Sequence, residues 1–264
     1  MTTMDNNMIS ISPQAAREIF ITSGCGLICQ HESGLFAGDP EGNAYISSGC
    51  VVIHSPGRWS VYDPGKWSDI KAAYGAVKPL MTDGEKLNLY PRCPLPEGWS
   101  EMKGEFRLAR GYSPYEDGEI RNITPDDMPA IETLCEYDEE DNRFGHKLTS
   151  EFLGGCRNSP GHFFSPGFAF GLFDKGELSG FINGGHMGYI GATVINLFVA
   201  RQKRGRGFAS RLLRALCASD PGAMYGYSCE KDNLASYRTA LSCGFVPVGE
   251  SLEAEGYEDR ERIE

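Results

Sequence analysis

The sequence lacks a long hydrophobic run, a surplus of basic charge and a secretory leader. No apolar run approaches the ~20 residues that cross a bilayer, and residues 1–7 are polar. Lys and Arg total 25 against 36 Asp and Glu, which gives a net charge of −11. Phosphate neutralisation needs a cationic face, so such a chain is a poor nucleic-acid binder. We expect a cytoplasmic protein that binds neither membranes nor nucleic acids.

Clustered cysteines are also missing. The nine cysteines are scattered and form no Cys-x-x-Cys pair, whereas zinc sites need Cys and His at short spacing. We therefore expect no metal, and we interpret the cysteines as reduced thiols that pack like small apolar side chains. With 41% hydrophobic and 23% charged residues over 264 positions, the chain has the composition of an ordinary globular protein.

A linker divides the chain into two expected domains, residues 1–115 and 116–264. Residues 111–118 are rich in Pro, Gly and charge, which is typical of a connection. The first part is interpreted as a smaller α/β domain that carries no chemical motif. Its pattern predicts a helix from Pro13 with Ser12 as N-cap, strands at 49–54 and 59–62, a helix at 66–80, and strands at 87–90 and 106–109.

The second part has a sharper pattern. A strand at 119–123 leads to Thr124, Pro125 and Asp127, which together form a capping box at the start of a helix. The predicted elements that follow are a helix at 145–156, strands at 169–173, 177–184 and 193–199, a helix at 207–218, a strand at 224–229, a helix at 234–242 and a strand from 245.

The segment after the strand at 193–199 carries a chemical signature. Gly205 and Gly207 allow a ligand to approach the backbone, and the free N–H groups and dipole of the helix start favour an anion. Positions 201–214 hold six of the 25 basic residues of this acidic chain. We therefore expect a small polyanionic ligand at this group of side chains: Arg201, Lys203, Arg204, Arg206, Arg211 and Arg214.

Two other phosphate-binding motifs fit less well. A P-loop needs Gly-x-x-x-x-Gly-Lys-Ser/Thr, which does not occur. A dinucleotide-binding loop needs Gly-x-Gly-x-x-Gly, and Ser210 takes the place of the third glycine. Glu230 lies near the distance at which that fold has its acidic residue, so a dinucleotide-binding enzyme is one alternative.

The run from Gln202 to Gly207 resembles the Q/R-x-x-G-x-G/A pyrophosphate loop of the GNAT superfamily of N-acetyltransferases. Residues 229–245 are similar to that family's second CoA-contacting segment, and residues 120–128 to its first strand and helix. The resemblance covers about residues 118–250. It implies an α/β (α+β) fold with a mixed, mostly antiparallel sheet flanked by helices. Some two-domain relatives carry a degenerate copy of this fold in the place of residues 1–115, which is one interpretation of that region.

The resemblance further implies an acyl-CoA-dependent N-acyltransferase, monomeric or homodimeric, that passes acetyl from acetyl-CoA to a primary amine by direct attack. The family often has a tyrosine where this chain has Ala240, and a carboxylate where it has Thr193. A non-catalytic acyl-CoA-binding module is therefore a second alternative. The residues expected to contact the cofactor are Leu197, Phe198, Val199, Gln202, Lys203, Arg204, Gly205, Arg206, Gly207, Phe208, Ala209, Asn233 and Ser236.

Proton transfer must then involve other groups. Ser236 and Tyr227 are candidates for a relay through water, whereas Leu234, Tyr237 and Leu241 share a stripe at helical spacing that is expected to face the core. In the implied fold, the loop between the first two helices flanks the acceptor site. Its acidic side chains would attract a cationic small-molecule or peptide amine, and they are Glu136, Asp138, Glu139, Glu140 and Asp141.

Overall fold

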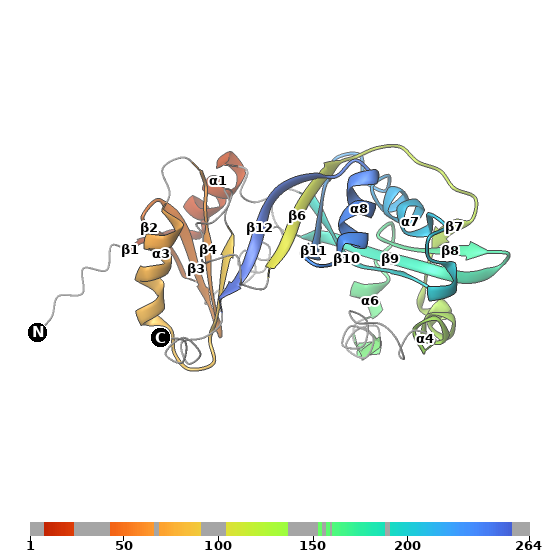
Figure 1. Cartoon of the computed structure of the whole chain (residues 1–264), viewed down its shortest axis with the longest axis horizontal. Coiled ribbons are helices and arrows are strands. Elements are labelled where there is room, and N and C mark those ends of the chain that lie inside the picture. Colours follow the sequence, from red (N-terminus) through yellow and green to blue (C-terminus); the bar gives the residue numbers. More distant parts are fainter. Residues whose placement is uncertain are drawn as a thin grey trace, which may run out of the picture.

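A computed structural model describes residues 8–23, 43–65, 69–90, 104–136, 153–154, 157–158, 160–187 and 191–254. Within these ranges, twelve strands form one continuous sheet in the order β1-β2-β3-β4-β5-β12-β6-β11-β10-β9-β8-β7 (Figure 1). The first five strands build the N-terminal half of the sheet. They are β1 (Met8–Ile11), β2 (Asn43–Ser47), β3 (Cys50–Ser55), β4 (Arg58–Tyr62) and β5 (Lys86–Tyr90).

The C-terminal half of the sheet contains the strands that follow the linker. They are β7 (Ile120–Asn122), β8 (Ala169–Asp174), β9 (Glu177–Met187), β10 (Gly191–Val199) and β11 (Met224–Glu230). Two further strands, β6 (Gly104–Gly111) and β12 (Val246–Ala254), lie between the halves. The helices are α1 (Pro13–Ser23), α3 (Ile70–Val77), α4 (Met128–Glu136), α6 (Pro160–Phe163), α7 (Phe208–Leu216) and α8 (Leu234–Ser242), with short 3₁₀ turns η2 (Lys78–Leu80), η3 (Pro125–Asp127) and η4 (Arg201–Lys203).

The two halves repeat one topology, although the sequence shows no repeat. In each half, four consecutive strands pair antiparallel, and a helix then carries the chain to a fifth strand that pairs parallel to the fourth. The connecting helix is α3 in the first half and α7 in the second. A parallel pair requires such a crossover, because a tight turn can join only antiparallel strands.

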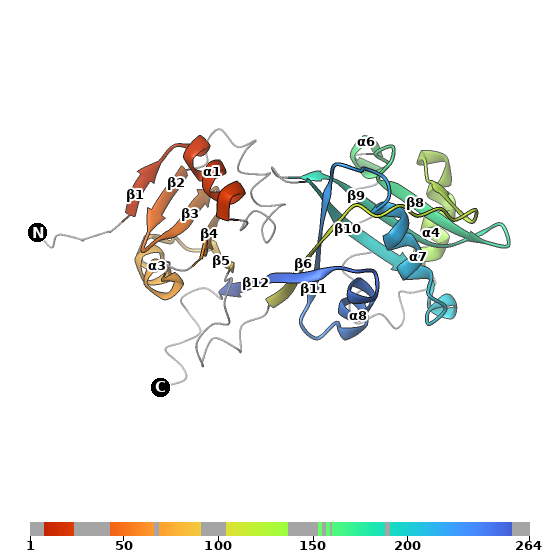
Figure 2. The ribbon, with the colours of Figure 1, turned by 90° about the horizontal axis from the view of Figure 1, so that it is seen from above.

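Strand β12 joins the halves. It pairs with β6 over most of its length and with β5 through residues 252–254 (Figure 2). Strand β6 pairs on its other edge with β11, so it belongs to the C-terminal half of the sheet although it precedes the linker. A boundary after residue 115 therefore separates β6 from the strands with which it pairs.

Helices cover both faces of the C-terminal half. Figure 1 shows α7 and α8 on one face and α4 and α6 on the other. The face beneath α7 and α8 buries residues such as Leu212 and Tyr225. The opposite face buries Ile131 of α4 and Phe163 of α6 against Phe181 of β9. Two smaller cores fill the N-terminal half, on the α1 and α3 sides.

Most elements follow the sequence pattern, with shifts at their ends. Helix α1 begins at Pro13, and Ser12 Oγ accepts a hydrogen bond from Ala15 N at 3.1 Å. The capping box at Thr124 and Asp127 is present, but its first turn is the 3₁₀ helix η3. The predicted helix at 66–80 begins at 70, and Pro79 confines its end to a 3₁₀ turn.

Two strands were not predicted, and one predicted helix cannot be compared with the structure. The pattern missed β1 and β2, which are short. The helix expected at 145–156 lies almost wholly outside the described residues. Within the described ranges, no helix is long and apolar enough to cross a membrane. The cysteines described there are all buried, namely Cys50, Cys135, Cys217, Cys229 and Cys243.

Candidate functional site

The basic glycine loop lies between the end of β10 and the start of α7. Gly205 and Gly207 have φ of 75° and 81°, in the left-handed region that side chains disfavour. A Cβ at either position would meet nothing within 4 Å, so the constraint there is backbone conformation, and the surface above each glycine is open. Both glycines therefore bend the chain in a conformation that other residues disfavour.

The start of α7 is a helix end without a side-chain cap. Gly207 is the N-cap residue and has no side chain to offer the first N–H groups. These groups have no partner within the helix, and together with the helix dipole they form a site for an anion. Phe208 and Ala209, two of the residues expected to contact the cofactor, lie in this first turn.

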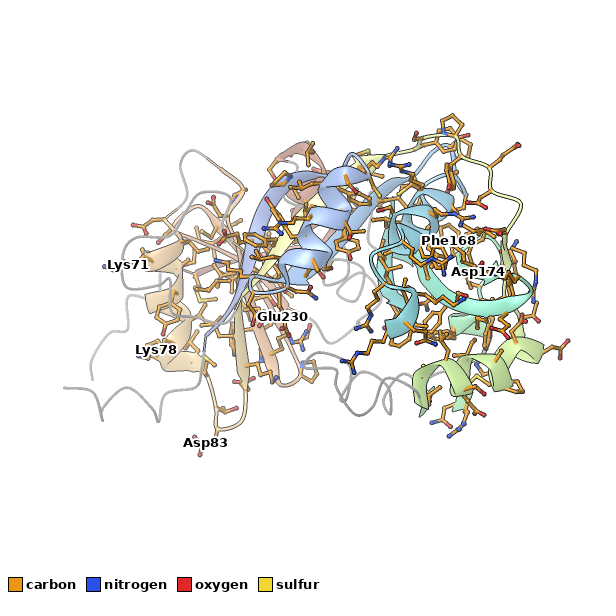
Figure 3. The ribbon with its side chains drawn as sticks, turned by 45° about the vertical axis from the view of Figure 1, so that its right-hand side comes forward. Lys71, Lys78, Asp83, Phe168, Asp174 and Glu230 are labelled. Atoms are coloured by element: carbon orange, nitrogen blue, oxygen red, sulfur yellow. The ribbon has the colours of Figure 1, made fainter. Side chains whose placement is uncertain are left out.

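Acidic side chains hold part of the basic loop in place. Asp174, at the end of β8, accepts hydrogen bonds from Lys203 Nζ at 2.7 Å and from Arg206 Nη1 at 3.1 Å. The hydrogen bond from Lys203 keeps the pKa of Asp174 below its usual value. Figure 3 labels Asp174 in the C-terminal half, away from Glu230 at the end of β11. The local positive charge is thus smaller than the sequence suggests, and nothing in the run around Asp174 marks it as a partner of the loop.

Two other basic residues have structural partners. Arg204 donates from Nε to the carbonyl oxygen of Val199 at 3.0 Å, which ties the loop to the end of β10. Arg211 donates to both carboxylate oxygens of Asp117, with Nε and Oδ2 2.6 Å apart. That pair holds the linker against α7. The hydrogen bonds from Arg211 lower the pKa of Asp117 to about 2.

Strands β10 and β11 separate soon after they begin. They pair only through Gly191–Met224, Ala192–Tyr225 and Thr193–Gly226, while β10 continues to Val199. Among the described residues, the edge of β10 that follows therefore has no strand beside it on the β11 side. Two predicted cofactor contacts flank this region on opposite faces, because Leu197 packs toward α7 and α8 and Phe198 toward α4 and α6. Val199 is buried.

The two predicted relay residues are in direct contact. The hydroxyl groups of Tyr227 on β11 and Ser236 on α8 are 2.7 Å apart. Burial raises the pKa of Tyr227 to about 12. Asn233, expected to contact the cofactor, caps α8, since its Oδ1 accepts a hydrogen bond from Ser236 N at 3.1 Å.

The side chains of α8 do not all face as expected. Leu234 and Leu241 are 49% and 40% exposed, so the predicted core stripe is wrong for both. Only Tyr237 of that stripe packs inward, with its ring 4.5 Å from that of Phe106 on β6. Ala240 is fully buried instead. The helix is tilted onto the core through the stripe that contains Ala240, and helical spacing alone does not reveal which stripe that is.

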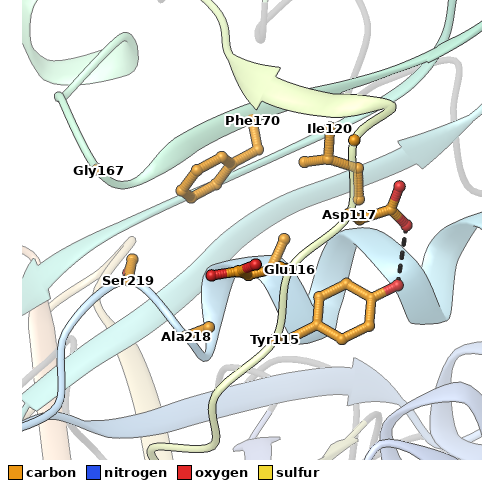
Figure 4. A pocket seen from close by; sticks show the side chains of 10 residues that line it. Tyr115, Glu116, Asp117, Ile120, Gly167, Phe170, Ala218 and Ser219 are labelled. Atoms are coloured by element: carbon orange, nitrogen blue, oxygen red, sulfur yellow. Dashed lines mark hydrogen bonds between the residues drawn. The ribbon is translucent and has the colours of Figure 1, made fainter.

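A cavity of about 590 Å³ lies elsewhere (Figure 4). It is lined by the linker, by Ile120 and Phe170, by Ala215 near the C-terminal end of α7 and by Ala218 just after that helix. The basic loop is at the other end of that helix, so this cavity is separate from the candidate site. Among the described residues, no cluster of His, Cys, Asp and Glu could hold a metal ion. The acidic loop lies outside those residues beyond Glu136.

Comparison with known proteins agrees with this geometry. Residues 119–245 match the sequence model of the acetyltransferase (GNAT) family. No curated protein has a significantly similar sequence. A GCN5-related N-acetyltransferase from Sphaerobacter thermophilus is similar in structure, with a TM-score of 0.52 and 14% identity over 97% of this chain and 98% of that one.

Two other solved structures have the same fold. An acetyltransferase of the GNAT family from Colwellia psychrerythraea has a TM-score of 0.50 and 12% identity, and covers 94% of this chain and 99% of its own. A functionally unknown conserved protein from Staphylococcus epidermidis has a TM-score of 0.54 and 10% identity, with 79% and 90% coverage. The likeness to the Sphaerobacter and Colwellia structures therefore extends over both halves of this chain.

Proposed function

We propose that residues 119–245, which form a domain of the acetyltransferase (GNAT) family, transfer acetyl from acetyl-CoA to a primary amine. The observation that carries this proposal is the separation of β10 from β11 directly before an uncapped helix start. An extended thioester could lie along the free edge of β10, and its diphosphate could then reach the N–H groups of α7. The runner-up is a dinucleotide-binding enzyme. Its reaction transfers no acyl group, so the separation of β10 from β11 would have no role in it.

Diphosphate binding would rest on the backbone more than on charge. The space above Gly205 and Gly207 is open, and an anion at the start of α7 would replace the missing cap. Lys203 and Arg206 share Asp174, so they would contribute a reduced positive field. Gln202 lies in the short turn η4 before them and could donate from its amide.

The reaction needs little covalent help from the protein. A neutral amine attacks the thioester carbon, and the nitrogen–carbon bond forms. The carbon–sulfur bond then breaks as CoA thiolate leaves, and the nitrogen releases its extra proton to water. A thiol has a pKa of about 8.5, so its thiolate leaves without a strong acid. A lysine-like amine, with a pKa of about 10.4, must first lose a proton.

The Tyr227–Ser236 pair could belong to the path of that proton. With a pKa of about 12, Tyr227 stays protonated near neutral pH and cannot act as a base. A hydroxyl pair can still pass a proton on when each oxygen accepts one while it donates another, and water between β10 and β11 would complete the chain. In this proposal the two hydroxyl groups relay the proton, and Tyr227 is never ionised.

Calorimetry with acetyl-CoA tests the binding step. Gly207→Val should weaken acetyl-CoA binding by at least about 100-fold, because its side chain blocks the backbone and disfavours φ of 81°. Gly84→Val is the matched control, since Gly84 has φ of 84° and equally open surroundings but lies in the N-terminal half. Equal affinities in both variants, with folding confirmed by circular dichroism, would refute the cofactor site.

A non-catalytic acyl-CoA-binding module is the second candidate. The burial of Ala240, where the family often has a tyrosine, favours it. Release of free CoA thiol with a panel of primary amines separates the two functions. A protein that binds acetyl-CoA but releases no thiol with any amine would be such a module. Stabilisation by NAD and not by acetyl-CoA in a thermal-shift assay would point to the dinucleotide reading.

A further inference from the structure

A pair of amide side chains interrupts the apolar core of the C-terminal half. Asn196 of β10 donates from Nδ2 to Oδ1 of Asn183 on β9, with 2.9 Å between the atoms. Asn183 is only 1% exposed, and Asn196 is half-buried. A buried amide costs free energy even when it is hydrogen-bonded in part, and an apolar pair would satisfy this place in the sheet. The pair therefore calls for a reason beyond packing.

The register places the pair on one face of the sheet. Asn196 lies opposite Asn183, and Phe198 lies opposite Phe181 two residues further along. Side chains two apart on a strand share a face. The two phenylalanines pack beneath α4 and α6, so the amides extend that row on the face turned away from α7 and α8. The next residue of β9 on this face, Gly185, adds no side chain to the row.

The pair also lies where the parallel strands separate. Strand β10 has lost its partner β11 by Val194, and its ladder with β9 is irregular between Val194 and Asn196. Irregularities of this kind re-aim side chains next to active sites. Asn183 fixes the Nδ2 group of Asn196. No donor among the described residues reaches Asn196 Oδ1, so that oxygen is an unused acceptor at the strand separation.

We infer that Asn196 Oδ1, oriented by Asn183, accepts a hydrogen bond from the attacking amine. This rests on the acyl transfer proposed above. A neutral primary amine has two N–H groups and one lone pair. When it donates one N–H to Asn196, its lone pair stays free to attack the thioester carbon. The acceptor then enters from the α4 and α6 face, while the CoA diphosphate is held on the α7 face, and the two substrates meet between β10 and β11.

Steady-state kinetics test this assignment. Acetyl-CoA is the donor, and the acceptor is the best of ethylamine, cadaverine, spermidine and a free-amino tripeptide. Asn196→Leu keeps the side-chain size but removes the acceptor, so kcat/KM for the amine should fall about tenfold. The dissociation constant of acetyl-CoA should not change. Asn196→Asp retains an acceptor oxygen, and Asn183 can turn its amide to donate to it, so this variant should stay within about threefold of wild type.

The matched control is Asn122→Ala. Asn122 lies on the same sheet, and its Oδ1 accepts from Gly167 N at 3.2 Å, far from the strand separation along the sheet order. Its kinetics should equal those of wild type. Should Asn196→Leu fail to fold, Asn183→Ala replaces it. That variant frees Asn196 to rotate and should raise the KM of the amine alone.

The results that would overturn the Asn196 assignment differ from those that would refute the proposed function. An unchanged kcat/KM for the amine in Asn196→Leu would overturn the assignment. So would an equal loss for amine and acetyl-CoA in both Asn196 variants, since a purely structural pair acts on both substrates. A wild-type protein that binds no acetyl-CoA and releases no CoA would instead refute the proposed function itself.

Discussion

The two parallel strand–helix–strand units of this molecule share a topology and differ at the one place that matters for a ligand. In the N-terminal unit, all five residues of β4 pair with β5, from Arg58–Lys86 to Tyr62–Tyr90. The rings of Tyr62 and Tyr90 stack at 4.6 Å and are buried at its end. In the C-terminal unit, only the first three residues of β10 pair with β11.

The helix starts differ in the same direction. Asp69 caps α3, and its Oδ1 accepts from Ala72 N at 2.9 Å. A carboxylate thus occupies the position that a phosphate would need. At α7 the equivalent position is Gly207, which leaves the N–H groups free. One topology can therefore be a closed structural unit or an open anion site, depending on strand separation and on one capping residue.

In the sequence, the segment between β4 and α3 carries one basic residue, whereas the segment between β10 and α7 carries four. Figure 3 shows Lys71 on α3 and Lys78 on η2 directly after it, away from Asp174 in the other half. The described residues between β4 and α3 include Asp63, whose Oδ1 accepts from Gly65 N at 2.8 Å. We therefore expect a single acyl-CoA to bind per chain, in the C-terminal half.

The largest expected effect comes from copying the N-terminal cap into the C-terminal unit. Gly207→Asp would place a carboxylate at the start of α7, and aspartate tolerates positive φ better than most residues. It should satisfy the free N–H groups and repel the diphosphate, which lowers acetyl-CoA affinity at least about 100-fold while the helix is kept. Calorimetry measures the affinity, and unchanged binding would show that the two helix starts are not the relevant difference.

A smaller effect concerns the contact that holds the linker to α7. The pKa of Asp117 is about 2 when folded, against about 3.9 unfolded, so its stabilisation is complete above pH 5 and lost as pH falls through 2. Asp117→Asn should cost on the order of 2 kcal/mol of unfolding free energy at pH 7 and little near pH 2. Urea unfolding at both pH values measures this. Equal losses at the two pH values would contradict the ion pair as the cause.

The proposed proton relay predicts a more modest loss of kcat. The loss should occur at Tyr227 and Ser236 but not at the neighbouring Tyr237. Tyr227→Phe and Ser236→Ala should each lower kcat by about tenfold, since a relay through water is worth less than the 10²–10⁴ of a positioned acid or base. Tyr237→Phe should change kcat little, because that ring packs on Phe106. A larger loss with Tyr237→Phe than with Tyr227→Phe, in folded protein that binds CoA, would reverse the assignment.

The smallest effect should come from the reverse exchange at the N-terminal helix. Asp69→Ala removes the cap of α3 and should cost about 1 kcal/mol of unfolding free energy. It should not create a second acetyl-CoA site, because β4 and β5 stay paired to their ends. Thermal unfolding gives the stability change, and calorimetric stoichiometry gives the number of sites. Two sites per chain would mean that the cap alone had closed the first unit.

The local features of this protein follow from short stretches of its sequence. The glycines at 205 and 207 need positive φ, the Thr124 capping box starts a helix, and strands and helices follow from periodicity within one segment. These features depend on neighbours a few residues apart, so a linear pattern contains them.

The tertiary structure decided what depends on residues far apart in the chain. The insertion of β6 beside β11, the hold of Asp174 on Lys203, and the exposure of Leu234 all follow from how strands pair and how helices lie on the sheet. Asn183 and Asn196 are unremarkable in the sequence, and they meet because the register of β9 and β10 is set by the pairing of whole strands. Pairing of this kind is fixed by the total burial of both faces, which no short segment encodes.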